Sequence, residues 1–533
     1  MGRQRLSSHN TTLSGNPSFP PQKKNLNSVL YEILPLSYIK VQTMSPVVAA
    51  LSPSSYDKLF INGAYVASRS VQTLQLRNPK DNSLVADKVP IANQEDVDLA
   101  VSHAEAAFAG PWSRFSAAQR SACLTRLADL MEMHLESILT LDSLTTGNPV
   151  SLIPTREKGY IRACLLYYAG WTDKQRGDYF PDDDGFVKLV RHEPLGVCVA
   201  INPYNSPVAS FMLKAAPCLA TGNVLIVKPS EKSPLGSLAV SALFEEAGFP
   251  KGVVQVLSGD GSTGALLARH MRVRKISFTG SVATGKKIQE MAAQSNLKRV
   301  TLELGGKSPA VIFDDANLEN ALTWTINGIL ARSGQVCVAA SRLYVQEGIA
   351  PSFIEAYKSR MAAAASRLGD PQDPSTTLGP LADSLSFDRV RQMVSRGAEE
   401  AELVVGGRQH GDKGCFMEPT VFVNPRPDAQ ILREEVFGPV AVIVTFKTED
   451  EVIGLANDTE FGLMAGVFTR DVGRAMRLSA KIEAGVVGVN CISVMNMQVP
   501  FGGKKASGVG REFGEYALRA FTEPKTILIN MNG

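Results

Sequence analysis

Residues 197–207 read VCVAINPYNSP, a short apolar run that stops at a loop with two prolines. Similar runs follow at Val224–Val227, Val253–Leu257 and Lys275–Phe278. Short runs rich in β-branched residues that end at Gly, Pro or Asn are typical of strands. Stretches with apolar residues at helical spacing follow them, at Ser237–Ala247, Gly264–His270 and Ala283–Ala293. Strands that alternate with helices predict crossover βαβ units and a parallel sheet.

The alternation extends beyond this centre in both directions. Upstream, apolar residues between positions 96 and 170 recur at helical spacing. Downstream, strand candidates continue at Ala310–Phe313, Leu343–Gln346, Val440–Phe446 and Val486–Val489. The sequence therefore predicts an α/β protein with two such domains, the first preceded by helices. In open α/β sheets, ligands bind at the carboxyl ends of the strands, so the loops there are the first candidates for a site.

The composition indicates a globular protein. Of 533 residues, 44% are hydrophobic and 20% charged, and 55 Lys and Arg against 52 Asp and Glu leave a net charge of +3. The sequence has no long basic run and no apolar stretch of about 18 residues, so we expect neither a nucleic-acid partner nor a membrane span. Seven scattered cysteines without a CxxC pair argue against a disulfide framework or a zinc ribbon and indicate a reducing compartment.

Residues 1–54 differ from the rest of the chain. They are rich in Ser, Asn, Thr and Pro and contain one acidic residue, Glu32. We interpret them as a disordered N-terminal extension and expect a cytoplasmic protein. Mitochondrial transit peptides are also basic, hydroxylated and poor in acids, so the mitochondrial matrix is the alternative. A transit peptide is disfavoured because residues 1–54 contain only two arginines and because Pro35 interrupts their apolar part.

Polar residues follow two of the predicted strands. Asn205 lies in the proline-bounded loop, where its amide could donate to a developing oxyanion, although Asn beside Pro is also an ordinary turn residue. Lys228 and Glu231 follow the next strand. This pair suits ribose hydroxyls, and solvated loop charges are the common alternative.

The loops after the next strands offer an anion site and a base. Gly280 and Ser281 precede a predicted helix, so they form either an anion site at its N-terminus or a plain serine cap. Glu303 stands between two leucines, where burial would raise its pKa as a general base requires. The alternative is a buried glutamate paired with Lys307.

Cys337 ends the tetrapeptide Gly334–Cys337. A cysteine after a glycine-containing turn is either a nucleophile or a small buried apolar residue. Glycines recur in Glu434–Pro439 and Pro500–Glu512, which predicts loops that bend closely against a neighbour or a ligand.

Four segments together resemble the signatures of the NAD(P)-dependent aldehyde dehydrogenase superfamily, in that family's order and spacing: Leu302–Pro309, Gly334–Cys337, Glu434–Pro439 and Pro500–Glu512. Each segment alone is weakly specific, but their ordered combination is highly specific. The similarity extends over about residues 59–529. It implies an enzyme that oxidises an aldehyde to a carboxylic acid with NAD(P)+ and needs no metal.

The resemblance also implies roles by position. Cys337 matches the nucleophile that forms a thiohemiacetal and then a thioester. Asn205 matches the side-chain donor of the oxyanion hole, beside the backbone N–H of Cys337, and Glu303 matches the base that activates water for hydrolysis. The cofactor-binding positions are Lys228, Glu231, Gly280, Ser281, Glu435 and Phe437. Because a carboxylate at Glu231 would repel a 2′-phosphate, NAD is favoured and NADP is possible.

The family fold implies an aldehyde dehydrogenase-like arrangement of two α/β domains with parallel sheets and a small β oligomerisation domain. We expect a Rossmann-like cofactor domain at 55–173 and 193–304 and a catalytic domain at 305–503. The oligomerisation domain, with the C-terminal segment, takes 174–192 and 504–533, and Asp182–Gly185 is a plausible hairpin turn within it. Relatives of this kind imply a homodimer or homotetramer.

Several positions that would line the substrate tunnel depart from the commoner residues of the family: Tyr204, Ser206, Leu213, Ala331, Val336 and Met495. We therefore expect a wider and less aromatic tunnel and a medium or bulky apolar aldehyde as substrate, such as an intermediate of specialised metabolism.

Two other functions are weighed against aldehyde oxidation. A non-catalytic relative that binds NAD would not need the intact set of site residues. A Cys-dependent hydrolase or acyltransferase needs a histidine partner, and none of the six histidines lies in a recognisable motif.

Overall fold

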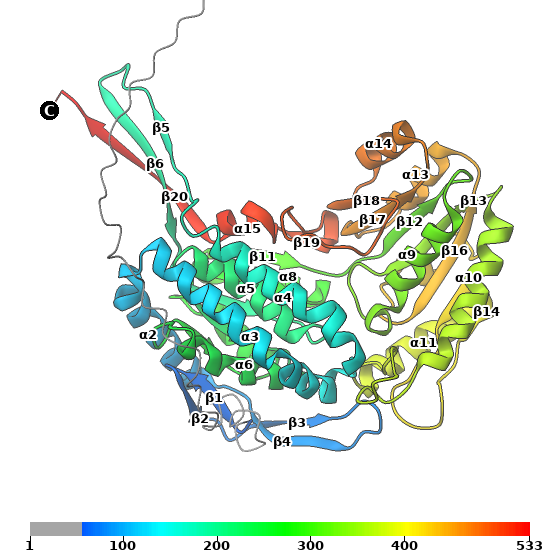
Figure 1. The fold of residues 1–533 in the computed structure, drawn as a ribbon, viewed down its shortest axis with the longest axis horizontal. Helices are drawn as coiled ribbons and strands as arrows, with labels where there is room; N and C mark the ends of the chain where they lie inside the picture. Colours follow the sequence, from blue (N-terminus) through cyan, green and yellow to red (C-terminus); the bar gives the residue numbers. More distant parts are fainter. Residues whose placement is uncertain (1–55, 533) are drawn as a thin grey trace, which may run out of the picture. The chain divides into compact units, whose positions relative to one another are not determined.

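The computed structural model describes residues 56–532, apart from the side chains at 155 and 156. The extension expected at residues 1–54 therefore lies outside the described residues. The described chain contains two large sheets, a three-stranded sheet and a two-stranded sheet, with helices packed around the large ones (Figure 1). This arrangement confirms the predicted α/β class.

The first large sheet has the strand order β19-β11-β10-β7-β8-β9-β1-β2. Its strands are β1 (Lys58–Ile61), β2 (Ala64–Ala67), β7 (Val197–Ile201), β8 (Val224–Lys228), β9 (Val254–Val256), β10 (Lys275–Thr279), β11 (Arg299–Glu303) and β19 (Gly508–Val509). Neighbours from β11 to β9 run parallel, and β1, β2 and β19 pair antiparallel at the edges. The four runs identified in the sequence form the parallel centre, with bounds that agree closely.

The centre of this sheet is apolar because helices cover it. Every residue of β7 and β8 is buried. Helices α2 (Gln94–Ala109), α5 (Pro207–Ala220) and α6 (Leu235–Glu246) pack against strands β7 to β9. The other helices of this half are α3 (Ala117–Thr146), α4 (Lys158–Ala169), α7 (Gly261–Arg269) and α8 (Val282–Ser295). A strand covered on both faces needs no polar alternation, which explains the continuous runs in the sequence.

One antiparallel edge of the sheet is a local hairpin. Strands β1 and β2 pair from Ile61 opposite Ala64, which leaves Asn62 and Gly63 as a two-residue turn. Both turn residues have positive φ, 53° and 77°, as a type I′ turn requires. The sheets are therefore mixed, with antiparallel edges added to a parallel centre.

The second large sheet has the order β14-β15-β16-β13-β12-β17-β18 and is parallel except at β14. Its strands are β12 (Ser308–Ile312), β13 (Ala340–Gln346), β14 (Glu402–Val405), β15 (Thr420–Val423), β16 (Val440–Phe446), β17 (Met464–Phe468) and β18 (Val486–Val489). The helices of this half are α9 (Leu318–Leu330), α10 (Ala350–Ala364), α11 (Ser384–Glu400), α12 (Gln430–Arg433), α13 (Glu449–Asn457) and α14 (Val472–Lys481). All four strand candidates of this region occur as strands.

The three-stranded sheet joins segments far apart in the sequence. Strand β20 (Thr522–Asn530) pairs antiparallel with β6 (Phe186–Pro194), which also pairs with β5 (Asp178–Phe180) (Figure 1). The turn between β5 and β6 contains residues 182–185, as the sequence predicts. Helix α15 (Gly514–Ala520) precedes β20, and β3 (Thr73–Arg77) pairs with β4 (Leu84–Pro90) in the two-stranded sheet.

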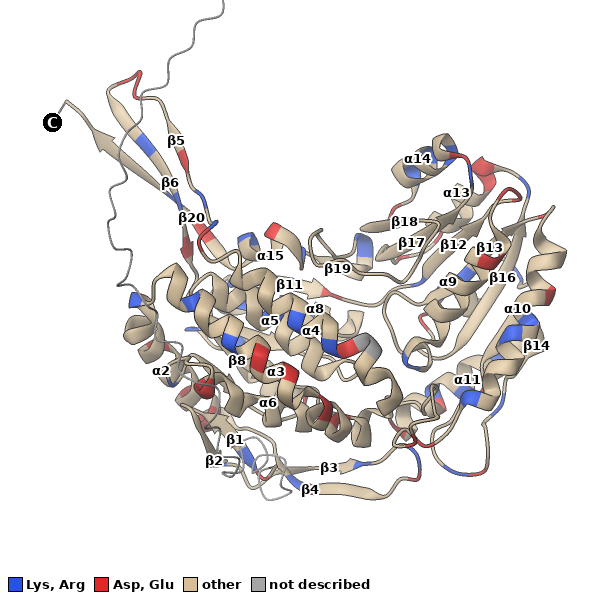
Figure 2. Ribbon diagram, in the orientation of Figure 1, with Lys and Arg blue, Asp and Glu red and all other residues tan. Residues whose placement is uncertain are grey.

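Charged residues of both signs are interspersed over the helices and strands (Figure 2). This distribution agrees with the small net charge of the chain. Among the helices of residues 56–532, none combines the length and the apolar character that crossing a membrane requires.

Candidate active site

A cavity of about 1440 Å³ opens at the carboxyl ends of β7, β8, β10 and β11 and reaches the loops before β13 and β16. The nine residues identified from the sequence all line it: Asn205, Lys228, Glu231, Gly280, Ser281, Glu303, Cys337, Glu435 and Phe437. The tertiary structure thus brings together residues from both halves of the chain.

Cys337 lies on a tightly bent loop between α9 and β13. Arg332, Ser333 and Gly334 have positive φ angles of 50°, 54° and 77°. A Cβ at position 334 would overlap the carbonyl of Gly438, so this position requires glycine on steric grounds as well. The loop is therefore held close to the segment that carries Glu435 and Phe437.

The surroundings of Cys337 favour its protonated thiol. Its pKa is raised to about 12, first by burial and then by the carboxylates of Glu435 and Glu303. The N–H groups of Cys337 and Val338 act in the opposite direction, because they hydrogen-bond the sulfur and favour the thiolate. Both N–H groups belong to the segment that carries Cys337, so the loop itself presents donors to the sulfur.

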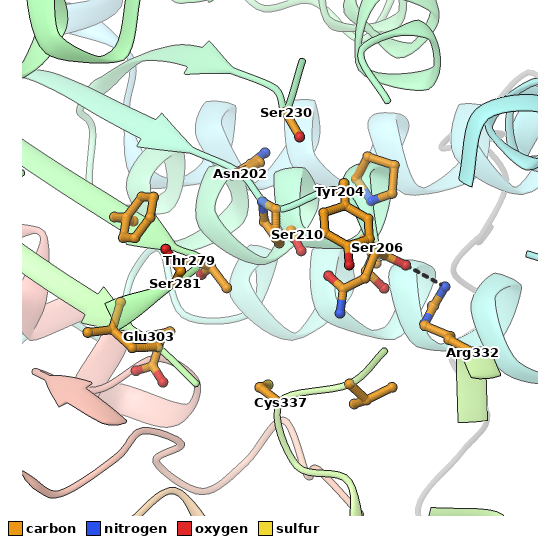
Figure 3. Close-up of a pocket in the computed structure, with 18 of the residues that line it drawn as sticks. Asn202, Tyr204, Ser206, Ser210, Ser230, Thr279, Ser281, Glu303, Arg332 and Cys337 are labelled. Carbon is orange, nitrogen blue, oxygen red and sulfur yellow. Dashed lines mark hydrogen bonds between the residues drawn. The ribbon is translucent and has the colours of Figure 1, made fainter. Parts of the chain in front are cut away.

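Asn205 is fixed on both its side chain and its backbone. Its Nδ2 donates to the carbonyl of Gln335, 2.7 Å away, on the Cys337 loop. Its own carbonyl accepts from Asn148 Nδ2 at 3.1 Å and from Arg332 Nη1 at 2.9 Å. In Figure 3 the loop with Tyr204 and Ser206 lies beside Cys337, with Glu303 on one side and Arg332 on the other.

Glu303 ends β11 and is 3% exposed. Neither carboxyl oxygen accepts a hydrogen bond from any described residue. Burial raises the pKa of Glu303 well above its usual range, and the neighbouring Glu512 adds to this, while Lys214 acts against it. The alternative pairing with Lys307 is wrong, because Lys307 Nζ donates to the carbonyl of Glu434 at 2.6 Å.

The Lys228–Glu231 pair lies at the far end of the cavity. Lys228 Nζ is 3.4 Å from Glu231 Oε2, with the lysine buried and the glutamate 45% exposed. Burial lowers the pKa of Lys228, and Glu231 partly offsets this. The alternative of a solvated loop charge is wrong for Lys228, which is buried, whereas Glu231 remains in contact with water.

Gly280 and Ser281 lie at the start of α8. The Ser281 hydroxyl accepts from the Thr284 N–H at 3.3 Å, so it caps the helix. Both residues also line the cavity. The cap and the anion site are therefore compatible, since a capped helix of this length still presents N–H groups at its N-terminus.

Glu435 and Phe437 lie on the loop before β16. Glu435 Oε1 accepts from the Gly306 N–H at 2.9 Å. Burial raises the pKa of Glu435 to about 7, while the Gly306 N–H, Arg389 and Lys307 lower it. Phe437 has a φ of 55°, and its ring meets that of Tyr204 edge-on at 6.0 Å between centroids.

The site contains residues that sequence reasoning did not single out: Asn148, Lys214, Arg332, Gln335, Arg389 and Glu512. Gln335 and Glu512 belong to the quoted motifs, which is the one signal that could have found them. Lys214, on α5, is buried and forms an ion pair with Glu512. Nothing in the sequence around Lys214 indicates this role. Arg389 donates to the carbonyls of Glu435 and Val436, at 3.1 and 2.8 Å, and so holds the loop of the Glu435 carboxylate.

Comparison with known proteins agrees with this geometry. The aldehyde dehydrogenase family matches residues 65–527. Retinal dehydrogenase 2 of Mus musculus is 44% identical over 481 residues, which cover 89% of this chain and 92% of the relative. An aldehyde dehydrogenase of Agaricus bisporus is 41% identical over 477 residues, with 89% and 95% covered.

Solved structures give the same result. The NAD+ complex of aldehyde dehydrogenase from Bacillus cereus has a TM-score of 0.88 and 38% identity, and covers 92% of this chain and 99% of its own. An indole-3-acetaldehyde dehydrogenase from P. syringae, in complex with NAD+ and IAA, has a TM-score of 0.87 and 36% identity, with 91% and 98% covered. The chain therefore belongs to the aldehyde dehydrogenase family and is an oxidoreductase that oxidises aldehydes with a nicotinamide cofactor.

Proposed function

We propose that one continuous cavity binds NAD+ along the first sheet and an aldehyde beside Cys337, and that Cys337, Asn205 and Glu303 carry out the oxidation. The observation that carries this proposal is the convergence of these three residues with Lys228, Glu231 and Glu435 on a single cavity. The three come from separate segments of the chain, so their meeting is a property of the fold and not of one motif.

The residues at the far end of the cavity fit a dinucleotide. A Cβ at Gly261 would meet nothing within 4 Å, and one at Gly264 only a methyl of Ile201 at 4.0 Å, so both glycines leave open space at the N-terminus of α7. The buried ammonium of Lys228, with Glu231 as its partner, suits ribose hydroxyls. The start of α8 suits the pyrophosphate, and Glu435 suits the second ribose.

The first chemical step is attack of the Cys337 sulfur on the aldehyde carbon, with the thiol proton released to solvent. As the C–S bond forms, negative charge develops on the aldehyde oxygen. The Asn205 amide keeps one N–H for this oxygen after donating to Gln335, and the Cys337 N–H is the second donor. When bound, the oxidised nicotinamide would supply the hydride acceptor. The product of this stage on the protein is a thioester of Cys337.

Glu303 then activates the water that hydrolyses the thioester. A carboxylate with a raised pKa takes a proton more readily than an exposed one, and burial supplies that rise here. Its two unpartnered oxygens leave it free to accept the water proton. Water attack releases the carboxylic acid and returns the thiol of Cys337.

The substrate class that we propose is a medium or bulky apolar aldehyde. Apolar side chains line the catalytic end of the cavity: Leu213, Trp324, Ala331, Val336, Met495, Phe501 and Phe513. Aromatic residues contribute more than the sequence suggested, whereas the small Ala331 leaves room. Two similar proteins are named for retinal and for indole-3-acetaldehyde, which are aldehydes of this kind. A kcat/KM that is highest for acetaldehyde would contradict the assignment.

We further propose self-association through the three-stranded sheet, as a homodimer or homotetramer. Several apolar side chains of β5, β6 and β20 are exposed: Tyr179, Phe180, Phe186, Leu528 and Ile529. A second copy of the chain would remove them from water. For the compartment, we retain the cytoplasm, with the mitochondrial matrix as the alternative should residues 1–54 act as a transit peptide.

The test is the formation of NADH by purified protein with aldehydes from acetaldehyde to long-chain and aromatic ones, with Cys337→Ala beside the wild type. We expect oxidation of a preferred apolar aldehyde and a loss of roughly 10⁴-fold or more in the variant, with NAD+ affinity retained. NAD+ binding without turnover of any aldehyde would favour a non-catalytic relative. Ester hydrolysis without aldehyde oxidation would favour a hydrolase. A Cys-dependent hydrolase needs a histidine partner, and no described histidine lines the cavity.

A further inference from the structure

The Asn205 carbonyl receives two hydrogen bonds, in addition to the bond that its side-chain amide donates. One comes from Asn148 and the other from Arg332, whose Nη1 is 2.9 Å from the oxygen. The guanidinium bond is charge-assisted, so it is the stronger of the two. Side chain and backbone of Asn205 are thus both tied, the first to Gln335 and the second mainly to Arg332.

Arg332 is itself held in an unusual position. Its second nitrogen, Nη2, forms an ion pair with Glu157, and the two side chains are only 20% and 18% exposed. Arg332 and Ser333 both adopt left-handed φ angles, which L-residues rarely do. Two contacts maintain this conformation, from Ser333 Oγ to the Gly379 carbonyl at 2.6 Å and from Gln335 Nε2 to the Arg332 carbonyl at 3.1 Å. Strained backbone that the surroundings maintain is often found at functional sites.

These contacts connect the oxyanion loop to the nucleophile loop. Arg332 lies five residues before Cys337 in the chain, so its guanidinium links the Cys337 loop directly to the peptide of Asn205. Donors of an oxyanion hole act only when they are held at hydrogen-bond distance from the developing charge. A loss of this link would therefore slow the chemical step and leave cofactor binding, at the other end of the cavity, unchanged.

We propose that Arg332 is a positioning residue for aldehyde oxidation, which acts through Asn205 by fixing the donor amide relative to Cys337. Glu157 neutralises the buried guanidinium and holds it in place. This inference rests on the proposed role of Asn205. Because removal of one oxyanion donor costs about 10²–10³-fold in kcat, an effect transmitted through that donor cannot exceed this range.

The experiment is a double-mutant cycle with Arg332→Met, Asn205→Ala and the double variant, measured as the rate of the first NADH turnover at saturating NAD+ and aldehyde. We expect Arg332→Met to slow this rate by roughly tenfold or more in the wild type and by less than about twofold in the Asn205→Ala background. The Kd for NAD+ stays within about twofold, and Arg332→Lys recovers part of the rate because an ammonium can still donate to the carbonyl. The control is Arg360→Met, which removes a surface arginine paired with Glu319 at 2.7 Å and leaves the rate unchanged.

Equal losses from Arg332→Met in both backgrounds would overturn the proposal, as would a wild-type rate in the folded variant. Should Asn205→Ala itself not slow the first turnover, the oxyanion role in the proposed function fails, which is a distinct result. Arg332→Met leaves Glu157 unpaired and could fail to fold. Arg332→Met/Glu157→Gln removes both charges and completes the same cycle in that case.

Discussion

The two ends of the cavity both contain charged side chains, but they differ in whether those charges are paired. At the cofactor end, Lys228 and Glu231 are charges of opposite sign that neutralise each other at 3.4 Å. At the catalytic end, Glu303 has no hydrogen-bond partner among the described residues, and the carboxylate of Glu512 lies near it. The first arrangement suits binding, because its charges are already satisfied. The second suits proton transfer, because burial and repulsion leave pKa values far from their usual range.

The comparison predicts that substitutions at the catalytic end alter rates and those at the cofactor end alter affinities. Glu303→Gln should give the largest effect on the rate of turnover. We expect kcat to fall by about 10²–10⁴-fold, because the water that attacks the thioester loses its base. The first turnover of NADH should survive as a burst, since that stage uses Cys337 and Asn205. Rapid-mixing measurement of NADH with saturating substrates checks this.

The pH dependence sharpens this prediction. In the wild type, hydrolysis of the thioester should accelerate as pH rises through the raised pKa of Glu303, because the ionised carboxyl is the base. Glu303→Gln should lose this dependence. A variant with an unchanged pH profile, or with no burst, would show that Glu303 does not act at this stage.

Glu231→Gln should give an intermediate effect, on affinity alone. Removal of the carboxylate ends the repulsion of a 2′-phosphate, so the Kd for NADP+ should fall by roughly tenfold, while the Kd for NAD+ changes little. Titration of the protein with each cofactor measures both constants. Glu245→Gln, which alters an exposed glutamate outside the cavity, is the matched control. A fall in kcat with unchanged Kd values would contradict the prediction that substitutions at the cofactor end alter affinity alone.

The smallest expected effect is on stability, again at Glu303. Its pKa is higher in the folded chain than in the unfolded chain, so the unfolded state ionises first as pH rises, and stability is lost between the two pKa values. Glu303→Gln removes this loss, which amounts to at most about 1.4 kcal/mol for each unit of pH. Thermal unfolding between about pH 5 and pH 8 should show the Tm of the variant rising relative to the wild type. A constant difference in Tm would contradict the raised pKa.

Much of the first sheet could be predicted because burial on both faces leaves a local signal. The runs at β7 and β8 are apolar over nearly their whole length, β9 and β10 are short and buried, and the helices between them have their own periodicity. The antiparallel edges were less visible. Asn62 and Gly63 are a strong hairpin signal, whereas the two residues of β19 are too few to recognise.

The candidate site shows a similar division. The nine residues taken from motifs all line the cavity, and the roles assigned to them stay predictions. Arg332, Asn148 and Lys214 were missed because their function lies in contacts across 57 to 298 positions of sequence. No local pattern of residue types reports such a distance.

By itself, the sequence determined the α/β class, eight strands of the two large sheets and, through the motif resemblance, the identity of the candidate nucleophile, because these depend on periodicity and on short motifs. Only the tertiary structure decided that β20 pairs with β6, that Lys307 binds the Glu434 carbonyl and not Glu303, and that Arg332 holds Asn205. It also decided the raised pKa values of Cys337, Glu303 and Glu435. The physical reason is that burial and electrostatic interaction act through space, between residues that only the fold brings together.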